Sequence, residues 1–395
     1  MKFISLGTID IKFLIPVLGG TFALIHLFLI GLNPKYEIAT KNPFILSIYT
    51  NIGMIFGFIP YIIIKHRSKA GNKIYNEQII KSELYKKLTD NKDVIKKTKY
   101  KKYRFIFYTA FLDFSYIMII TFFTQYFAYN LWIFDIIFMS LFSFLIFKTK
   151  YYKHQFISMI IIVILGFGFN IIAYFKSINA EVGLTFINIL MKFIAEICFC
   201  LSIVIMKYNL EKNYCNPYEL CFWEGIFEFI LYSICLAIFC IFGLSANKFK
   251  HPDNLIKFFN QYDYNDFIVC LAIIITYFLY NNSIILTCDY LTPIHLLIIS
   301  VINEVYIHFL QKSNLALNIF SFFILLLIFI MLLVFIEVIE INICKLSYNT
   351  KRNIESRSKT DTSVELEAIN LLNDEPELDE GRDSDIIASN YIINY

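Results

Sequence analysis

The segment CNPYELCFWEGIFEFIL at 215–231 repeats, in outline, the segment KNPFILSIYTNIGMIFGF at 41–58, displaced by 174 residues. Each segment carries an Asn-Pro pair, Asn42-Pro43 in the first and Asn216-Pro217 in the second, followed by an apolar run. Proline fits the first turn of a helix, so each pair indicates where a helix begins. An internal repeat of this kind predicts a chain built from two similar halves.

The composition indicates a membrane protein. The chain has 395 residues, is 58% hydrophobic and 17% charged, and has a mean hydropathy of +0.61. A bilayer-spanning helix needs about 20 mostly apolar residues. We expect ten such runs, at 12–32, 44–64, 104–124, 127–147, 155–175, 183–206, 218–243, 266–287, 293–311 and 316–341. The first run is long enough to span, so we expect it to be retained as a helix and not cleaved as a signal peptide.

The ten runs divide into a first repeat at 12–175 and a second at 183–341, within a domain of residues 1–343. An odd number of spans in each half inverts the second half in the membrane. The sequence therefore predicts an all-α polytopic membrane protein with ten transmembrane helices in two inverted five-helix repeats. Inverted repeats are typical of transporters, which bind their substrate near the bilayer midplane between the halves.

Basic residues predict the orientation. The loops after helices two, four, six and eight hold nineteen Lys and Arg residues, fourteen of them in or beside the basic loop 65–103, against seven in the other loops. The positive-inside rule then places both termini in the cytosol. Residues 344–395 are rich in Asp and Glu and lack apolar periodicity, so we expect a disordered acidic tail.

Ionisable residues lie inside the apolar runs, where a charged side chain costs about 2.5–3.5 kcal/mol and usually faces a cavity or a partner. These residues are Asp113, Asp135, Lys192, Glu196, Glu224, Glu228 and Glu304. The spacing of Lys192 and Glu196 predicts a local ion pair. All seven, Lys192 included, are candidates for substrate binding or proton coupling. The alternative for Asp113 and Asp135 is a structural hydrogen bond to a neighbouring Tyr or Ser.

Glu224 and Glu228 are four residues apart and therefore share one face of a helix. Two nearby carboxylates cannot both ionise cheaply, so we expect one of them to hold a proton near neutral pH. Asn281 and Asn282 could orient a ligand or could hold helices together. The Gly53-x-x-x-Gly57 spacing predicts close packing of helix two against a neighbour.

The stretches FLDFSYIMIITFFTQYFAYNLWIFDIIFMSLFSFLIFKTKYYKHQFISMIIIVILGFGF at 111–169, NPYELCFWEGIFEF at 216–229 and YFLYNNSIILTCDYLTPIHLLIISVINE at 277–304 resemble the drug/metabolite transporter superfamily. The chain is most similar to its solute carrier family 35 and chloroquine-resistance-transporter-like branches. The resemblance covers residues 12–341 and implies alternating access, with helices five and ten at the periphery. GDP-mannose carriers of this superfamily have F-Y-N-N where this chain has Phe222-Trp223-Glu224-Gly225.

We therefore expect a secondary transporter of a small polar solute, coupled to protons, with no enzymatic activity, no cofactor, no metal site and no nucleic-acid partner. A nucleotide-sugar antiporter and a multi-spanning receptor or scaffold are the alternatives, and a homodimer is compatible with the sequence. In the tail, Glu367, Leu371 and Leu372 match the acidic dileucine pattern that sorting adaptors bind. This pattern favours an endosomal, lysosomal or vacuolar membrane over the Golgi.

Overall fold

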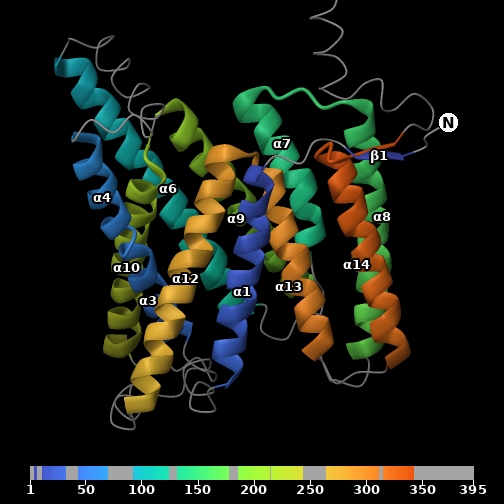
Figure 1. Cartoon of the computed structure of the whole chain (residues 1–395). Coiled ribbons are helices and arrows are strands. Elements are labelled where there is room, and N and C mark those ends of the chain that lie inside the picture. Colours follow the sequence, from blue (N-terminus) through green and yellow to red (C-terminus); the bar gives the residue numbers. More distant parts are fainter. Residues whose placement is uncertain are drawn as a thin grey trace, which may run out of the picture.

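The computed structural model describes residues 4–6, 11–32, 43–69, 92–123, 131–177, 186–213, 215–242, 264–310 and 315–341. Within these ranges the regular secondary structure is helical apart from two three-residue strands (Figure 1). The α-helices are α1 (Leu14–Leu32), α3 (Pro43–Ile55), α4 (Phe58–Lys69), α6 (Lys92–Phe123), α7 (Asp135–Phe147), α8 (Lys153–Ser177), α9 (Phe186–Lys212), α10 (Pro217–Phe242), α12 (Tyr264–Tyr290), α13 (Leu297–Leu310) and α14 (Leu315–Phe335). Short 3-10 helices precede α1, α7 and α13, at Ile11–Phe13, Trp132–Phe134 and Pro293–Leu296.

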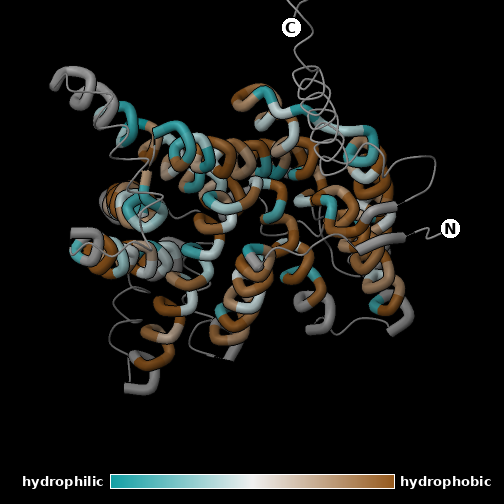
Figure 2. The backbone as a smooth tube through the Cα atoms, turned by 45° about the horizontal axis from the view of Figure 1, so that its top comes forward, coloured by the Kyte–Doolittle hydropathy of each residue, from teal (hydrophilic) through white to brown (hydrophobic). Residues whose placement is uncertain are grey.

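Six of these helices are long and apolar enough to cross a membrane. They cover Tyr100–Ile120, Lys153–Ile171, Ile189–Lys212, Pro217–Ile238, Ile268–Tyr290 and Asn318–Phe335. Four shorter apolar stretches lie at Leu14–Leu29, Thr50–Ile64, Leu131–Phe147 and Pro293–Val305. Hydrophobic residues run along most of the helices (Figure 2), and large apolar side chains on α8 and α14 point outward. Apolar side chains in such numbers on an outer surface suit lipid, so the chain is an integral membrane protein.

Each of the ten predicted runs overlaps a helix, but two of them, 44–64 and 316–341, differ from the helices in the structure. The predicted run 44–64 is interrupted at Phe56–Gly57, because Pro60 has no N–H with which to bond the Phe56 carbonyl. That carbonyl accepts from Ile59 N instead, at 3.0 Å, and the helix resumes as α4. The ends of the predicted basic loop 65–103 are helical, because α4 extends to Lys69 and α6 begins at Lys92.

The last predicted run, 316–341, ends six residues early. Helix α14 stops at Phe335, and Glu337 adopts a left-handed φ of 64°. Glu337 N then bonds Val334 O and Val338 N bonds Leu333 O, which is the Schellman arrangement that closes a helix. Strand β2 (Ile339–Ile341) follows and pairs antiparallel with β1 (Ile4–Leu6). This pairing places residues 4–6 and 339–341 at the same end of the bundle (Figure 1).

The helices pack in a pattern that joins the first half of the chain to the second. Helix α1 packs on α12 and α13, α6 packs on α9 and α10, and α7 packs on α9. Helix α3 lies against both α10 and α12. Helices α8 and α14 pack on each other at one side of the bundle (Figure 1).

Glycine permits the close approach of α3 to its two neighbours. A Cβ on Gly53 would lie 2.7 Å from the Ile274 carbonyl oxygen of α12, and one on Gly225 of α10 would lie 2.6 Å from the Met54 Cβ of α3. Neither contact is tolerable without movement of the backbone. The packing role predicted for Gly53 is therefore confirmed, and Gly225 serves the same purpose on the opposite helix.

Candidate functional site

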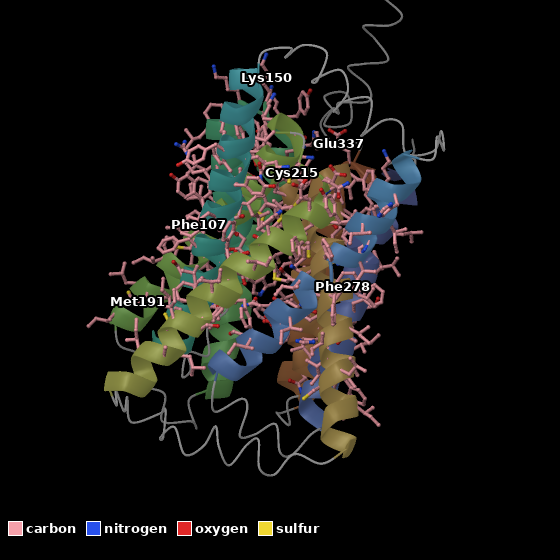
Figure 3. All side chains as sticks on the ribbon, turned by 90° about the vertical axis from the view of Figure 1, so that its left-hand side faces the viewer. Phe107, Lys150, Met191, Cys215, Phe278 and Glu337 are labelled. Atoms are coloured by element: carbon pink, nitrogen blue, oxygen red, sulfur yellow. The ribbon has the colours of Figure 1, made fainter. Side chains whose placement is uncertain are left out.

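Three of the predicted acids meet where α6 packs on α10. Asp113 of α6 and Glu224 and Glu228 of α10 each place one carboxylate oxygen within 4.8 Å of the other two. We call these three residues the acid cluster. Figure 3 looks onto this side of the bundle, with Phe107 of α6 and Phe278 of α12 labelled on either side of α10. All three acids lie within candidate membrane spans.

Burial and hydrogen bonding differ among the three carboxylates. Glu224 is 0% exposed and Glu228 is 3% exposed. The Ser202 hydroxyl of α9 donates a hydrogen bond to Asp113 Oδ1. Neither oxygen of Glu224 has a hydrogen-bond partner within the described residues. The Thr109 hydroxyl lies beside Glu224 but donates its hydrogen to the Ile106 carbonyl at 2.7 Å, so Glu224, unlike Asp113, receives no hydrogen bond from the part of the chain that the structure describes.

Polar side chains that the sequence did not single out surround the acid cluster. Tyr232 of α10 and Tyr277 of α12 both interact electrostatically with Glu228 and Asp113. Tyr280 of α12 interacts with Asp113. Asn51 of α3, whose backbone carbonyl oxygen lies beside Gly225 of α10, is buried, and neither atom of its side-chain amide has a hydrogen-bond partner within the described residues. A single asparagine inside an apolar segment is the signal that could have identified Asn51. The chain contains so many tyrosines that the sequence does not distinguish these three from the others.

Asn281 and Asn282 lie on α12, beside the helices that carry the acid cluster. The Asn281 amide nitrogen is 3.9 Å from Cys221 Sγ of α10. The Asn282 amide nitrogen donates to the Phe278 carbonyl at 2.7 Å, and its Oδ1 has no partner within the described residues. Asn281 therefore contacts α10, while Asn282 keeps one buried acceptor available.

The other predicted residues form a second group on α7, α9 and α13. The predicted ion pair is present, with Lys192 Nζ 2.8 Å from Glu196 Oε1. Asp135 interacts electrostatically with both members of this pair, and Glu304 interacts with Lys192. Lys192 thus lies among three carboxylates, and its single positive charge interacts with all three of them.

Tyr116 of α6 connects the two groups. Lys192 Nζ lies 6.0 Å from the centroid of its ring, and Tyr116 interacts electrostatically with Glu196, Asp135 and Asp113. The structure therefore divides the predicted site residues into an acid cluster without a lysine and a second group built around one lysine. Seven cysteines within the described residues are free thiols, namely Cys198, Cys200, Cys215, Cys221, Cys235, Cys270 and Cys288.

Two predicted features lie outside the described residues. The sorting motif Glu367, Leu371 and Leu372 belongs to the tail, and residues 70–91 form the centre of the basic loop. Their assignments stay predictions.

Comparison of the chain with models of known protein families and with curated proteins finds no match. The arrangement of the helices and of the buried ionisable residues is what bears on the function of this chain.

Proposed function

We propose that the protein is a secondary transporter that moves a small polar solute by alternating access, coupled to protons. In this proposal ten transmembrane helices form two inverted five-helix repeats, in the manner of the drug/metabolite transporter superfamily that the sequence resembles. The packing of the helices is the observation that carries the proposal.

The most extensive helix contacts are unchanged when the two halves are exchanged, whereas the contact of α13 with α14 has no equivalent of similar extent between α7 and α8. Let α1, α3 with α4, α6, α7 and α8 correspond in order to α9, α10, α12, α13 and α14. The contact of α1 with α12 then becomes that of α9 with α6, and the contact of α1 with α13 becomes that of α9 with α7. The contact of α3 with α12 becomes that of α10 with α6, while the pairs α3 with α10 and α8 with α14 map onto themselves. Two repeats related by a pseudo-two-fold axis would produce this pattern.

Local structure supports the same correspondence. Helices α3 and α10 both begin at the proline of an Asn-Pro pair, and α7 and α13 both follow a short 3-10 helix. The strand pair brings the beginning and the end of the helical part to one end of the bundle, as an even number of spans requires. The interruption between α3 and α4 resembles the discontinuous helices that line transporter sites.

The acid cluster is the proposed transport site. Glu224 would bind a polar group of the substrate or share a transported proton, because it is a fully buried carboxylate that receives no hydrogen bond from the described residues. The nucleotide-sugar alternative needs a cation for the phosphates, but Lys192 is already paired with Glu196. We therefore favour a solute that acids can bind.

The proposal includes the orientation of the protein in the membrane and its compartment in the cell. The excess of basic residues in one set of loops supports cytosolic termini. The dileucine motif would engage sorting adaptors and direct the protein to an endosomal, lysosomal or vacuolar membrane, with the Golgi as the alternative.

Uptake into proteoliposomes tests the function. Purified protein is reconstituted and offered amino acids, peptides, polyamines and nucleotide sugars, with and without a proton gradient. We expect gradient-dependent uptake, loss of the gradient response in Glu224→Gln, and normal behaviour of Glu211→Gln, whose carboxylate is exposed on α9. A reconstituted wild type that transports none of these solutes would favour a receptor or scaffold, and a normal gradient response in Glu224→Gln would remove the proposed role of that carboxylate.

A further inference from the structure

We propose that Asp113, Glu224 and Glu228 form a binding site for a divalent metal cation of the kind that prefers oxygen ligands, such as Mg²⁺, Mn²⁺ or Ca²⁺. The inference rests on the proposed function in that it names a ligand class for the same site. The metal site does not depend on the direction in which the protein transports its substrate.

The separation of the carboxylates suits one shared ion. Mg²⁺ and Ca²⁺ bind oxygen at about 2.0–2.6 Å, so two ligand atoms on opposite sides of an ion lie about 4–5 Å apart. The three carboxylates each contribute an oxygen within 4.8 Å of the other two. A single cation among them could therefore contact all three without a change in the packing of α6 on α10.

The hydrogen bonding of the site gives a second and independent indication. Both oxygens of Glu224 lack a hydrogen-bond partner within the described residues, although the side chain is completely buried. Buried polar groups are normally satisfied, so these oxygen atoms leave a place for a ligand that accepts their lone pairs.

The charge of the surroundings specifies a cation. Within the described residues no Lys, Arg or His forms an ion pair with any of the three acids, and Lys192 is held by Glu196. Buried carboxylates are paired, protonated or bound to a metal. The group contains no His or Cys ligand, and carboxylates suit Mg²⁺, Mn²⁺ and Ca²⁺. The hydrogen bond from Ser202 orients Asp113 in the way that outer partners orient metal ligands.

Mn²⁺ binding to the full chain in detergent tests the inference. Free Mn²⁺ gives a sharp electron paramagnetic resonance signal that broadens when the ion is bound, so bound and free ion are measured directly. We expect one Mn²⁺ per chain, displaced by Mg²⁺ or Ca²⁺. Binding should weaken by about tenfold or more in Glu228→Gln and in Asp113→Asn.

The controls separate this inference from the proposed function. Glu211→Gln should bind Mn²⁺ as the wild type does, and the elution profile and melting temperature of each variant report its folding. Should Glu228→Gln not fold, Asp113→Asn and the wild-type titration decide the outcome. Wild-type protein that leaves the Mn²⁺ signal unchanged, or acid-cluster variants that bind as tightly as Glu211→Gln, would overturn the metal site. Uptake with no Mn²⁺ binding would overturn the metal site and leave the transporter proposal standing. Mn²⁺ binding with no uptake of any solute or of Mn²⁺ would support the metal site and overturn the transporter proposal.

Discussion

Lys102 of α6 and Glu219 of α10 form an ion pair in which Nζ lies 2.7 Å from Oε1. The two side chains are only 17% and 12% exposed, and the Tyr103 hydroxyl donates a further hydrogen bond to Glu219 at 3.4 Å. Glu219 lies in the first turn of α10, where the helix dipole favours a carboxylate. The pair thus joins the two helices that carry the acid cluster.

A double-mutant cycle tests the strength of this link. Lys102→Met leaves the largely buried Glu219 without its cation, so we expect a loss of stability of about 1–3 kcal/mol, since hydrogen bonds to charged groups are of this size. The measurement is the melting temperature in detergent of Lys102→Met, Glu219→Gln and the double variant. Glu211→Gln breaks a pair whose carboxylate is 44% exposed and should cost about 0–1 kcal/mol. Additive losses in the cycle would mean that the two side chains do not stabilise each other.

Glycine substitutions test the packing of α3. Gly53→Ala should destabilise the protein, because the new Cβ would lie 2.7 Å from the Ile274 carbonyl oxygen and the backbone of α3 or α12 would have to move. Gly168→Ala is the matched control, because its Cβ would lie 3.7 Å from Ile324 Cδ1 in ordinary contact. Alanine favours a helix by about 1 kcal/mol over glycine, so the control should melt at or above the wild-type temperature. Equal melting of the two variants would contradict the close packing.

The second ionisable group yields a prediction about charge balance. Lys192→Met removes the cation from a group that contains Glu196 and Asp135, both buried, and should cost about 3–5 kcal/mol. Lys192→Met combined with Glu196→Gln should recover part of that loss, because the uncompensated carboxylate is gone. Thermal unfolding of the single and double variants provides the comparison. A double variant no more stable than Lys192→Met would show that the lysine acts through packing and not through charge.

The topology is tested by labelling from one side. Single cysteines introduced at 70–91 and at 250–260 are exposed to a membrane-impermeant maleimide in intact cells and after permeabilisation. We expect the first set to react only after permeabilisation if the protein is at the cell surface, because its loop holds most of the basic residues. In an organelle both reactions are compared in sealed vesicles. Labelling of both sets from the same face would contradict the proposed ten spans.

The sorting motif is tested by replacing both leucines. Leu371→Ala with Leu372→Ala should move the protein toward the cell surface or leave it in the Golgi, because adaptors require the leucine pair. Fluorescence microscopy beside organelle markers gives the readout. Glu365→Gln is the control, because it removes an acidic side chain two residues before Glu367 and outside the motif. An unchanged distribution of the double variant would identify the motif as a chance match.

Several features were predictable because they depend on local order along the chain. The apolar runs indicated the helices, the Asn216-Pro217 pair indicated the start of α10, and the spacing of Lys192 and Glu196 indicated their ion pair. The end of α14 was harder to predict, because Glu337 closes the helix in a left-handed conformation that usually calls for glycine. The interruption at Phe56–Gly57 could have been predicted from Pro60, which cannot donate a helical hydrogen bond.

The sequence by itself determined that the chain is an integral membrane protein and which acids lie within its helices, because hydropathy and helical spacing are local properties. Only the tertiary structure decided that Asp113 joins Glu224 and Glu228, while Asp135 and Glu304 join Lys192. Helical periodicity relates residues three or four positions apart on one helix. The meeting of side chains from different helices depends on how those helices rotate and cross, and here close contacts such as that of Gly53 with α12 set those positions.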